Sequence, residues 1–199
     1  MTTTDIKLSK DLEKGIHFSC LMCGTCCRGL DEGEVYLYDE DIKLLANHLN
    51  FKGFEGLKEF AKKYLKVIND SFLWKEPGAE RKKTYRFKTL AFRFTGDDDH
   101  CHFLKDNKCS IHEARPFQCR CFPFWQMMIS NRSNFTNYSK KCPGLRELKG
   151  NFYSKENIVE WARAERKLEL NYFLKMKANG FDILKLYPFL PKQLLENGD

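Results

Sequence analysis

A dense cysteine motif near the start of the chain limits what it can fold into. The motif spells C-x-x-C-x-x-C-C and consists of Cys20, Cys23, Cys26 and Cys27. Two-residue gaps suit metal binding, because a short turn can aim both thiolates at one ion, and the glycines at positions 24 and 29 ease that bend. Adjacent side chains diverge in most backbone conformations, so we expect the last two thiols to serve different metals or opposite sides of one cluster.

A second group of cysteines follows far downstream. It comprises Cys101, Cys109, Cys119, Cys121 and Cys142. Together the two groups supply enough thiolates for two four-coordinate sites or one polynuclear site. The first three cysteines of the motif resemble the C-x2-C-x2-C run that binds a four-iron cluster in bacterial ferredoxins, and Cys142-Pro143 resembles the remote ligand there. The match is partial, because the fourth cysteine of the motif follows the third directly.

The start of the chain does not read as a secretory signal. Charges are scattered through the first twenty residues, and no later segment approaches the roughly 20 consecutive apolar residues of a membrane span. We therefore expect a soluble, cytoplasmic protein with reduced thiols. In that compartment clustered cysteines more often bind metal or do redox chemistry, and nine cysteines would leave one thiol over in a pure disulfide framework.

Histidines and arginines lie beside several of these cysteines. The imidazoles are potential metal ligands, although a surface or hydrogen-bonding role is the commoner one. The guanidinium groups either donate to sulfur and offset thiolate charge or are ordinary surface arginines. The residues concerned are His100, His102, His112, Arg28, Arg115 and Arg120.

The formal net charge of +7 arises from 34 Lys and Arg against 27 Asp and Glu. We interpret its short basic runs, at residues 62–63, 81–83 and 140–141, as solvated faces. No zinc-finger, homeodomain or RNA-recognition pattern accompanies them, so nucleic acid is not a predicted partner. Metal held by four thiolates would also lower the positive charge, because the formal count treats cysteine as neutral.

Hydrophobic spacing predicts several short elements in the first half of the chain. A strand is expected over residues 34–38, and one or two strands over residues 84–95. Asp39 is the expected N-cap of a helix that runs to about Asn50. A second helix is expected over residues 55–67.

The strongest helical signal lies near the C-terminus, over residues 154–179. Ser154 is the expected N-cap, Gly180 the expected stop, and the apolar stripe of this helix is expected to face a core. Residues 101–125, in contrast, are too rich in Cys, Pro and turn residues for long regular structure.

We expect an α+β fold in a single domain, residues 1–199. Its centre would be a small, irregular, cysteine-rich metal-binding core with short strands, flanked by helices that include the long C-terminal one. Within it we distinguish a polar arm at 1–16, a metal-binding region at 17–145 and the helix at 154–180.

At this level the chain resembles the CxxCxxCC cysteine-cluster family, the YkgJ-type zinc- or iron-chelating proteins. The resemblance is carried by residues 18–29, 101–104, 109–125 and 142–144. It implies a metal-binding set of eight cysteines, whereas Cys121 falls where the family pattern often has another residue. The implied ligands are Cys20, Cys23, Cys26, Cys27, Cys101, Cys109, Cys119 and Cys142.

Three hypotheses about function follow. The first is a protein that chelates zinc or iron, with an iron–sulfur cluster as one form of the centre. The second is an iron–sulfur enzyme that modifies a protein, since a similar cluster occurs in flagellin lysine methylases. The third is a zinc-stapled module that holds a protein partner without turnover. No glycine-rich nucleotide loop, Ser-His-Asp set or metalloprotease histidine pair points to another chemistry.

Overall fold

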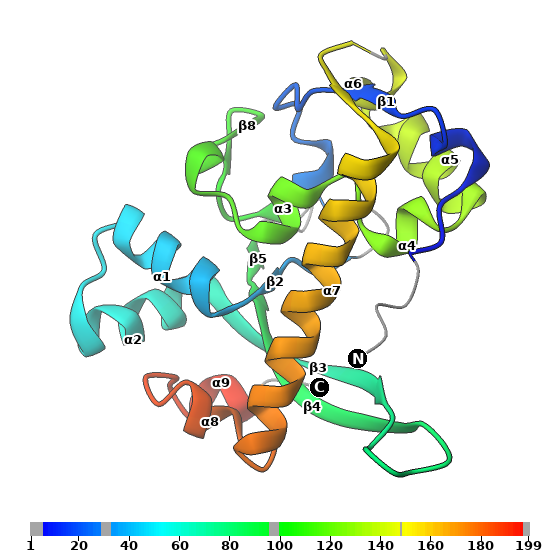
Figure 1. The fold of residues 1–199 in the computed structure, drawn as a ribbon. Helices are drawn as coiled ribbons and strands as arrows, with labels where there is room; N and C mark the ends of the chain where they lie inside the picture. Colours follow the sequence, from blue (N-terminus) through cyan, green and yellow to red (C-terminus); the bar gives the residue numbers. More distant parts are fainter. Residues whose placement is uncertain (1–5, 29–32, 96–99, 148, 197–199) are drawn as a thin grey trace. The chain divides into compact units, whose positions relative to one another are not determined.

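The computed structural model describes residues 6–28, 33–95, 100–147 and 149–196 (Figure 1). Residues 1–5 of the predicted polar arm and Gly29 lie outside these ranges. The chain divides into two compact units. One comprises residues 1–33 and 94–168 and carries all nine cysteines, and the other comprises residues 34–93 and 169–199. We call them the cysteine unit and the sheet unit.

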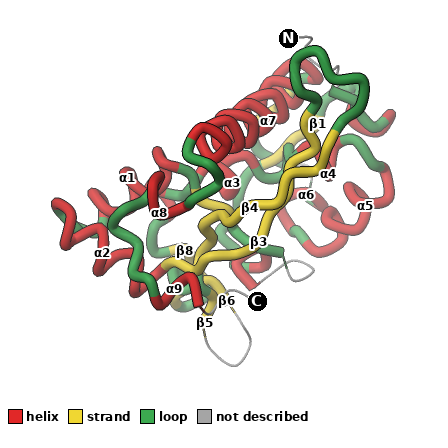
Figure 2. The backbone as a smooth tube through the Cα atoms, turned by 90° about the horizontal axis from the view of Figure 1, so that it is seen from below, coloured by secondary structure: helices red, strands yellow, loops and turns green. Residues whose placement is uncertain are grey.

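The sheet unit is built on a three-stranded antiparallel sheet in the order β2-β4-β3. The strands β3 (Leu65–Trp74) and β4 (Lys83–Phe92) pair along their whole length, while β2 (Tyr36–Leu37) adds a short edge. Figure 2 shows β3 and β4 as a long twisted ribbon. A turn at Pro77 and Gly78 joins them, and a backbone hydrogen bond from Ala79 N to Glu76 O closes it at 3.1 Å.

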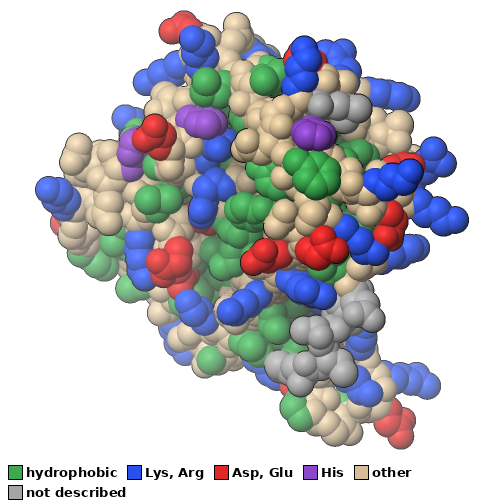
Figure 3. All heavy atoms as spheres, turned by 45° about the horizontal axis from the view of Figure 1, so that its top comes forward, with side chains coloured by type: hydrophobic (Ala, Val, Ile, Leu, Met, Phe, Trp, Pro, Cys, Tyr) green, Lys and Arg blue, Asp and Glu red, His purple; other side chains and the backbone are tan. Residues whose placement is uncertain are grey.

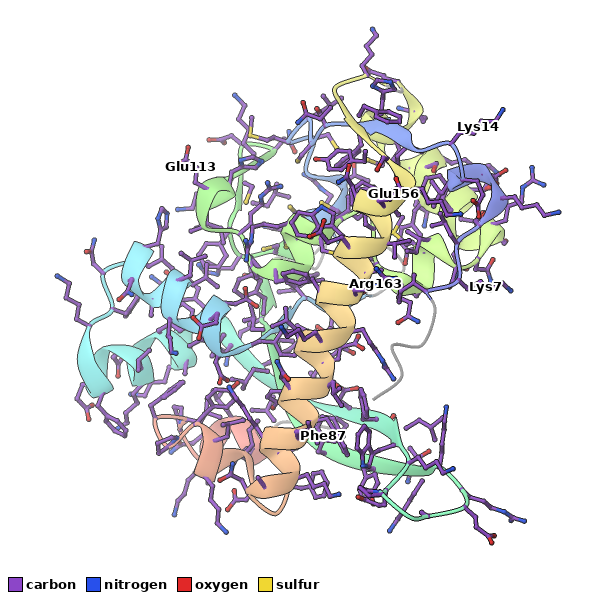
Figure 4. The ribbon with its side chains drawn as sticks, in the orientation of Figure 1. Lys7, Lys14, Phe87, Glu113, Glu156 and Arg163 are labelled. Atoms are coloured by element: carbon purple, nitrogen blue, oxygen red, sulfur yellow. The ribbon has the colours of Figure 1, made fainter. Side chains whose placement is uncertain are left out.

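Side chains alternate between the two faces of this sheet, as a strand requires. One face carries Phe72 and Phe87, which lie against Phe173 in the second half of the helix α7 (Lys155–Ala178). The rings of Phe72 and Phe173 stack with centroids 4.7 Å apart, and Figure 4 places Phe87 beside that part of the helix. The other face carries Leu65 and Leu90, both fully buried.

Four helices complete the sheet unit besides α7. The first two follow β2 directly, and the last two end the described chain. They are α1 (Asp39–His48), α2 (Gly53–Tyr64), α8 (Ile183–Leu186) and α9 (Gln193–Glu196).

Three predicted boundaries in this unit were wrong. The strand expected over residues 34–38 contains only Tyr36 and Leu37. The helix expected over residues 55–67 ends at Tyr64, because Leu65 pairs with Phe92 and begins β3. Asp39 is the first helical residue and not the N-cap, which is Tyr38. The Asp39 carboxylate instead accepts hydrogen bonds from distant side chains of the same unit.

The long helix α7 (Lys155–Ala178) confirms the strongest prediction. Ser154 Oγ accepts a hydrogen bond from Asn157 N at 3.3 Å, which is the expected N-cap contact. Gly180 has φ +66° and stops the helix as predicted. The predicted stripe is half-buried or buried along its length. Its members are Ile158, Trp161, Ala164, Leu168, Tyr172 and Met176.

The cysteine unit contains short elements only, apart from the first half of α7. Its described strands form three antiparallel pairs. Strand β1 (Ile16–Phe18) pairs with β9 (Asn151–Tyr153), β5 (Phe94–Thr95) pairs with β6 (His100–Cys101), and β7 (Leu104–Lys105) pairs with β8 (Lys108–Cys109). The helical elements are η1 (Lys10–Leu12), η2 (Thr25–Arg28), η4 (His112–Ala114), α3 (Phe117–Cys121), α4 (Gln126–Ile129), α5 (Arg132–Lys141) and α6 (Pro143–Arg146). The prediction that residues 101–125 lack long regular structure is confirmed, as are two strands within 84–95.

This unit has an apolar core of its own beside the cysteines. Phe18 lies edge-on to Phe122 and Phe124, and Ile158 of α7 is fully buried among them. The short helices α4 and α5 contribute Met128 and Tyr138, among others. The unit therefore does not depend on the thiols alone for its packing.

Two further observations concern the surface and the helices. All residues of the three basic runs are exposed, as predicted, and Figure 3 shows Lys and Arg interspersed with Asp and Glu on the face it draws. Within the described residues, every helix is too short or too polar to cross a lipid bilayer.

Candidate metal centre

The cysteine motif folds as a tight loop that leads into η2. Gly24 has φ +74°, and its carbonyl accepts a hydrogen bond from Cys27 N at 3.0 Å. A Cβ atom at Gly24 would lie 2.9 Å from Leu104 Cδ1 and 3.3 Å from the carbonyl oxygen of Asn107. Glycine is therefore needed here both for the backbone angle and for the close approach of β7 and its turn.

The motif is tied to the β7–β8 hairpin by a side-chain hydrogen bond. Arg28 Nη2 donates to Asn107 Oδ1 at 2.6 Å. Asp106 and Asn107 form the two-residue turn with φ +48° and +60°, which is the conformation that a tight hairpin favours. Arg28 thus positions the first cysteine group beside the strands that carry Cys101 and Cys109.

The thiols of the two groups lie close enough to repel one another when ionised, and Cys26 takes part in most of these repulsions. The pKa of Cys26 is raised, first by a hydrogen bond with Cys27, then by burial of its sulfur, then by repulsion from Cys27 and Cys23. Cys26 in turn raises the pKa of cysteines from the three distant stretches. These are Cys101, Cys109, Cys119 and Cys142.

Burial is the first cause of the raised pKa in each of those four cysteines. Burial, with repulsion from Cys109 and Cys26, raises the pKa of Cys101 to about 11. The pKa of Cys109 is raised by burial and then by Cys26 and Cys20, while Arg115 lowers it. Cys20 is thereby linked to the same group. All eight cysteines implied by the resemblance are brought into one region of the cysteine unit.

Cys26 and Cys27 are neighbours on the 3-10 turn η2, where a hydrogen bond between their thiols and the repulsion between them raise the pKa of Cys26. That the two thiols serve different metals or opposite sides of one cluster stays a prediction.

Exposure divides the thiols into two sets. Cys20, Cys23 and Cys26 are exposed, although protein atoms surround the sulfur of Cys26, whereas Cys101 and Cys142 are buried. All nine cysteines are free thiols, so the disulfide alternative is not realised.

Cys121 stands apart from the other eight. It is fully buried in the apolar core, and its thiol lies 3.9 Å from the carbonyl oxygen of Trp161. Burial raises its pKa, and the charged neighbour that adds to this is Glu165 rather than a cysteine. The structure therefore places Cys121 as a small core residue.

The three arginines beside the cysteines have different roles. Arg115 lowers the pKa of both Cys109 and Cys119, which is the charge compensation that we predicted as one alternative. Arg28 binds the hairpin turn. Arg120 Nε donates to the carbonyl of Arg115 at 3.0 Å and so braces the loop.

The donor set fits a thiophilic metal in its chemistry. Within the ranges that the structure describes, no group of three or more His, Cys, Asp or Glu side chains has the geometry to hold a metal ion. Clustered thiolates repel one another, and a cation among them removes that repulsion. Thiolates select zinc and iron over hard cations such as magnesium.

Comparison with known proteins agrees with this arrangement. A family model named CxxCxxCC, described as "Putative zinc- or iron-chelating domain", matches residues 19–143. The match spans more than half of the chain and includes all eight clustered cysteines. No solved structure matches the chain.

Proposed function

The chain belongs to the CxxCxxCC family, and on this premise we propose that its cysteine unit binds zinc or iron through eight thiolates. The proposed ligands are Cys20, Cys23, Cys26, Cys27, Cys101, Cys109, Cys119 and Cys142. The observation that carries the proposal is the electrostatic link between Cys26 and thiols from the three distant stretches. Free thiols throughout also support the cytoplasmic location predicted from the sequence.

The raised pKa values give the proposed centre a defined protonation chemistry. Since burial and repulsion from Cys109 and Cys26 raise the pKa of Cys101 to about 11, this thiol is protonated at neutral pH in the metal-free protein. A metal ion must displace such protons to bind, so its apparent affinity falls as the pH is lowered. Arg115 partly offsets this cost at Cys109 and Cys119, because its guanidinium group favours their thiolate forms.

The proposal is tested by metal analysis of protein purified without exposure to air. Cys26→Ser should lose most of the metal, because it removes the thiol that neighbours the largest number of the others. Cys121→Ala is the matched control, since it removes a cysteine from the same unit but outside the cluster, and it should keep the wild-type metal content. An unchanged metal content in Cys26→Ser would contradict the assignment.

The same samples distinguish the forms that the centre could take. Broad visible absorption with iron and acid-labile sulfide would establish an iron–sulfur cluster, and colourless protein with stoichiometric zinc would establish a zinc site. Calorimetry with S-adenosylmethionine then tests the protein-modifying alternative, which requires binding of a methyl donor. Absence of both heat and methyl transfer would count against the enzyme, and the zinc-stapled interaction module would be the next hypothesis to test.

A further inference from the structure

His112 lies between two of the proposed ligands and is held firmly in place. It begins η4, which follows Cys109 and precedes Cys119 in the chain. Ala114 N donates to Ile111 O at 2.9 Å, and Arg115 Nε donates to the carbonyl oxygen of His112 at 2.8 Å. Figure 4 shows the neighbouring Glu113 at the outer side of this turn.

The imidazole of His112 has a buried nitrogen without a partner. Its Nε2 atom is inaccessible to solvent and makes no hydrogen bond to any residue that the structure describes. Buried polar atoms in proteins are nearly always paired, because an unpaired one loses its hydrogen bonds to water. Within the part of the chain that the structure describes, this nitrogen is thus available to a bound metal ion.

The surroundings favour the neutral form of this imidazole, the form that binds metals. Burial lowers the pKa of His112, and the adjacent Arg115 lowers it further. A neutral imidazole has a lone pair on one ring nitrogen, which is what a metal ion requires.

His17, which also lies in the cysteine unit, differs from His112 because its ring is at the surface. His17 is exposed, and its Nδ1 lies 3.2 Å from the carbonyl oxygen of Gly150. His17 is therefore a suitable control for His112.

We propose that His112 supplies a nitrogen ligand, through Nε2, to the metal centre formed by the clustered thiols. The inference rests on the proposed function, because it needs a metal in the cysteine unit. It assigns a mixed nitrogen and sulfur environment to the site, where the family resemblance implies cysteines alone. An imidazole is a neutral donor, so it adds a ligand without adding to the negative charge of the thiolates.

X-ray absorption at the zinc or iron edge tests this inference on anaerobically purified full-length protein. Wild type and His17→Phe should both show the multiple scattering of one metal-bound imidazole beside a sulfur shell. His112→Phe should lack the imidazole signal while keeping the sulfur shell. It should also lose metal to a chelator faster, on the order of tenfold.

The possible results separate this inference from the proposed function. Wild-type protein with metal bound by sulfur alone would overturn the role of His112 and leave the proposed function intact. An imidazole signal that persists in His112→Phe would likewise overturn it. Wild-type protein without stoichiometric metal would overturn both. Because the first and third results need no variant, a folding defect in His112→Phe does not weaken the test.

Discussion

The two units differ in how their regular structure is maintained. In the sheet unit β3 and β4 run for ten residues each and are held by continuous pairing and by the aromatic rings around Phe173. In the cysteine unit β6, β7 and β8 are two residues long, and the thiols lie on such short strands, on short helical turns and on the segments beside them. Long elements can be stabilised by apolar burial, whereas short segments of this kind gain most from cross-links, and we propose that a metal ion supplies them.

Removal of the metal should have the largest effect, and it should destabilise the cysteine unit far more than the sheet unit. We expect a chelator to abolish amide protection around residues 100–121 and to leave β3 and β4 protected. The expected effect is large, because structural zinc sites contribute on the order of 10 kcal/mol to the folding of small domains. Hydrogen exchange read by mass spectrometry measures both units in one sample. Equal loss of protection in both units would show that they do not differ in this way.

A substitution in the core of the sheet unit should lower the stability without loss of metal. Phe173 is fully buried and stacks on Phe72. Phe173→Ala should lower the free energy of unfolding by about 3–5 kcal/mol, as is typical for loss of a buried aromatic ring. Chemical denaturation gives the stability, and metal analysis of the folded variant should give the wild-type content. Metal loss at unchanged stability would contradict this account.

A glycine substitution sharpens the comparison further. Gly24→Ala places a Cβ 2.9 Å from Leu104 Cδ1 and strains the left-handed backbone, so it should lower the metal content and cost about 1–2 kcal/mol or more. Gly78→Ala is the matched control, since Gly78 has φ +79° but nothing lies within 4 Å of its Cβ position. It should carry the backbone strain alone and keep the metal. Equal metal loss in both variants would argue against the close approach at Gly24.

The smallest expected effect concerns Asp39 in the sheet unit. Burial raises its pKa, but hydrogen bonds from Lys175 and from the Tyr187 hydroxyl, at 2.6 Å, outweigh burial and leave the pKa below its ordinary value. A carboxylate with a lowered pKa stabilises the fold above its unfolded pKa of about 4, and this contribution is lost as the pH falls through the folded value. Asp39→Asn should therefore cost about 1 kcal/mol at pH 7 and almost nothing near pH 2. Urea denaturation at the two pH values measures it, and an equal cost at both would contradict the ion-pair role.

Local signals in the sequence predicted the elements whose ends depend on local chemistry. Ser154 and Gly180 delimit α7 because a cap and a left-handed stop act on neighbouring backbone groups. The family resemblance implies that the cysteine motif and Cys142 share a metal site, and this stays a prediction, supported by the effect of Cys23 and Cys26 on the pKa of Cys142.

The sequence predictions were wrong where contacts between residues far apart in the chain determine the local structure. Leu65 and Val67 fit the helical spacing before them, yet they form a strand because β4 pairs with them. Asp39 looks like a cap, but Lys175 and Tyr187, more than a hundred residues away, bind its carboxylate. The sequence identified His112 as a potential ligand, but the burial of its Nε2 atom without a partner among the described residues depends on tertiary structure.

The reactivity of Cys20 and Cys23 tests the central claim most directly. Both side chains are open to solvent, so a bound metal ion is what would protect them from an alkylating reagent. The account predicts slow alkylation of both in the anaerobic protein and fast alkylation after chelation, read by mass spectrometry at each cysteine. Equally fast alkylation before and after chelation would contradict it.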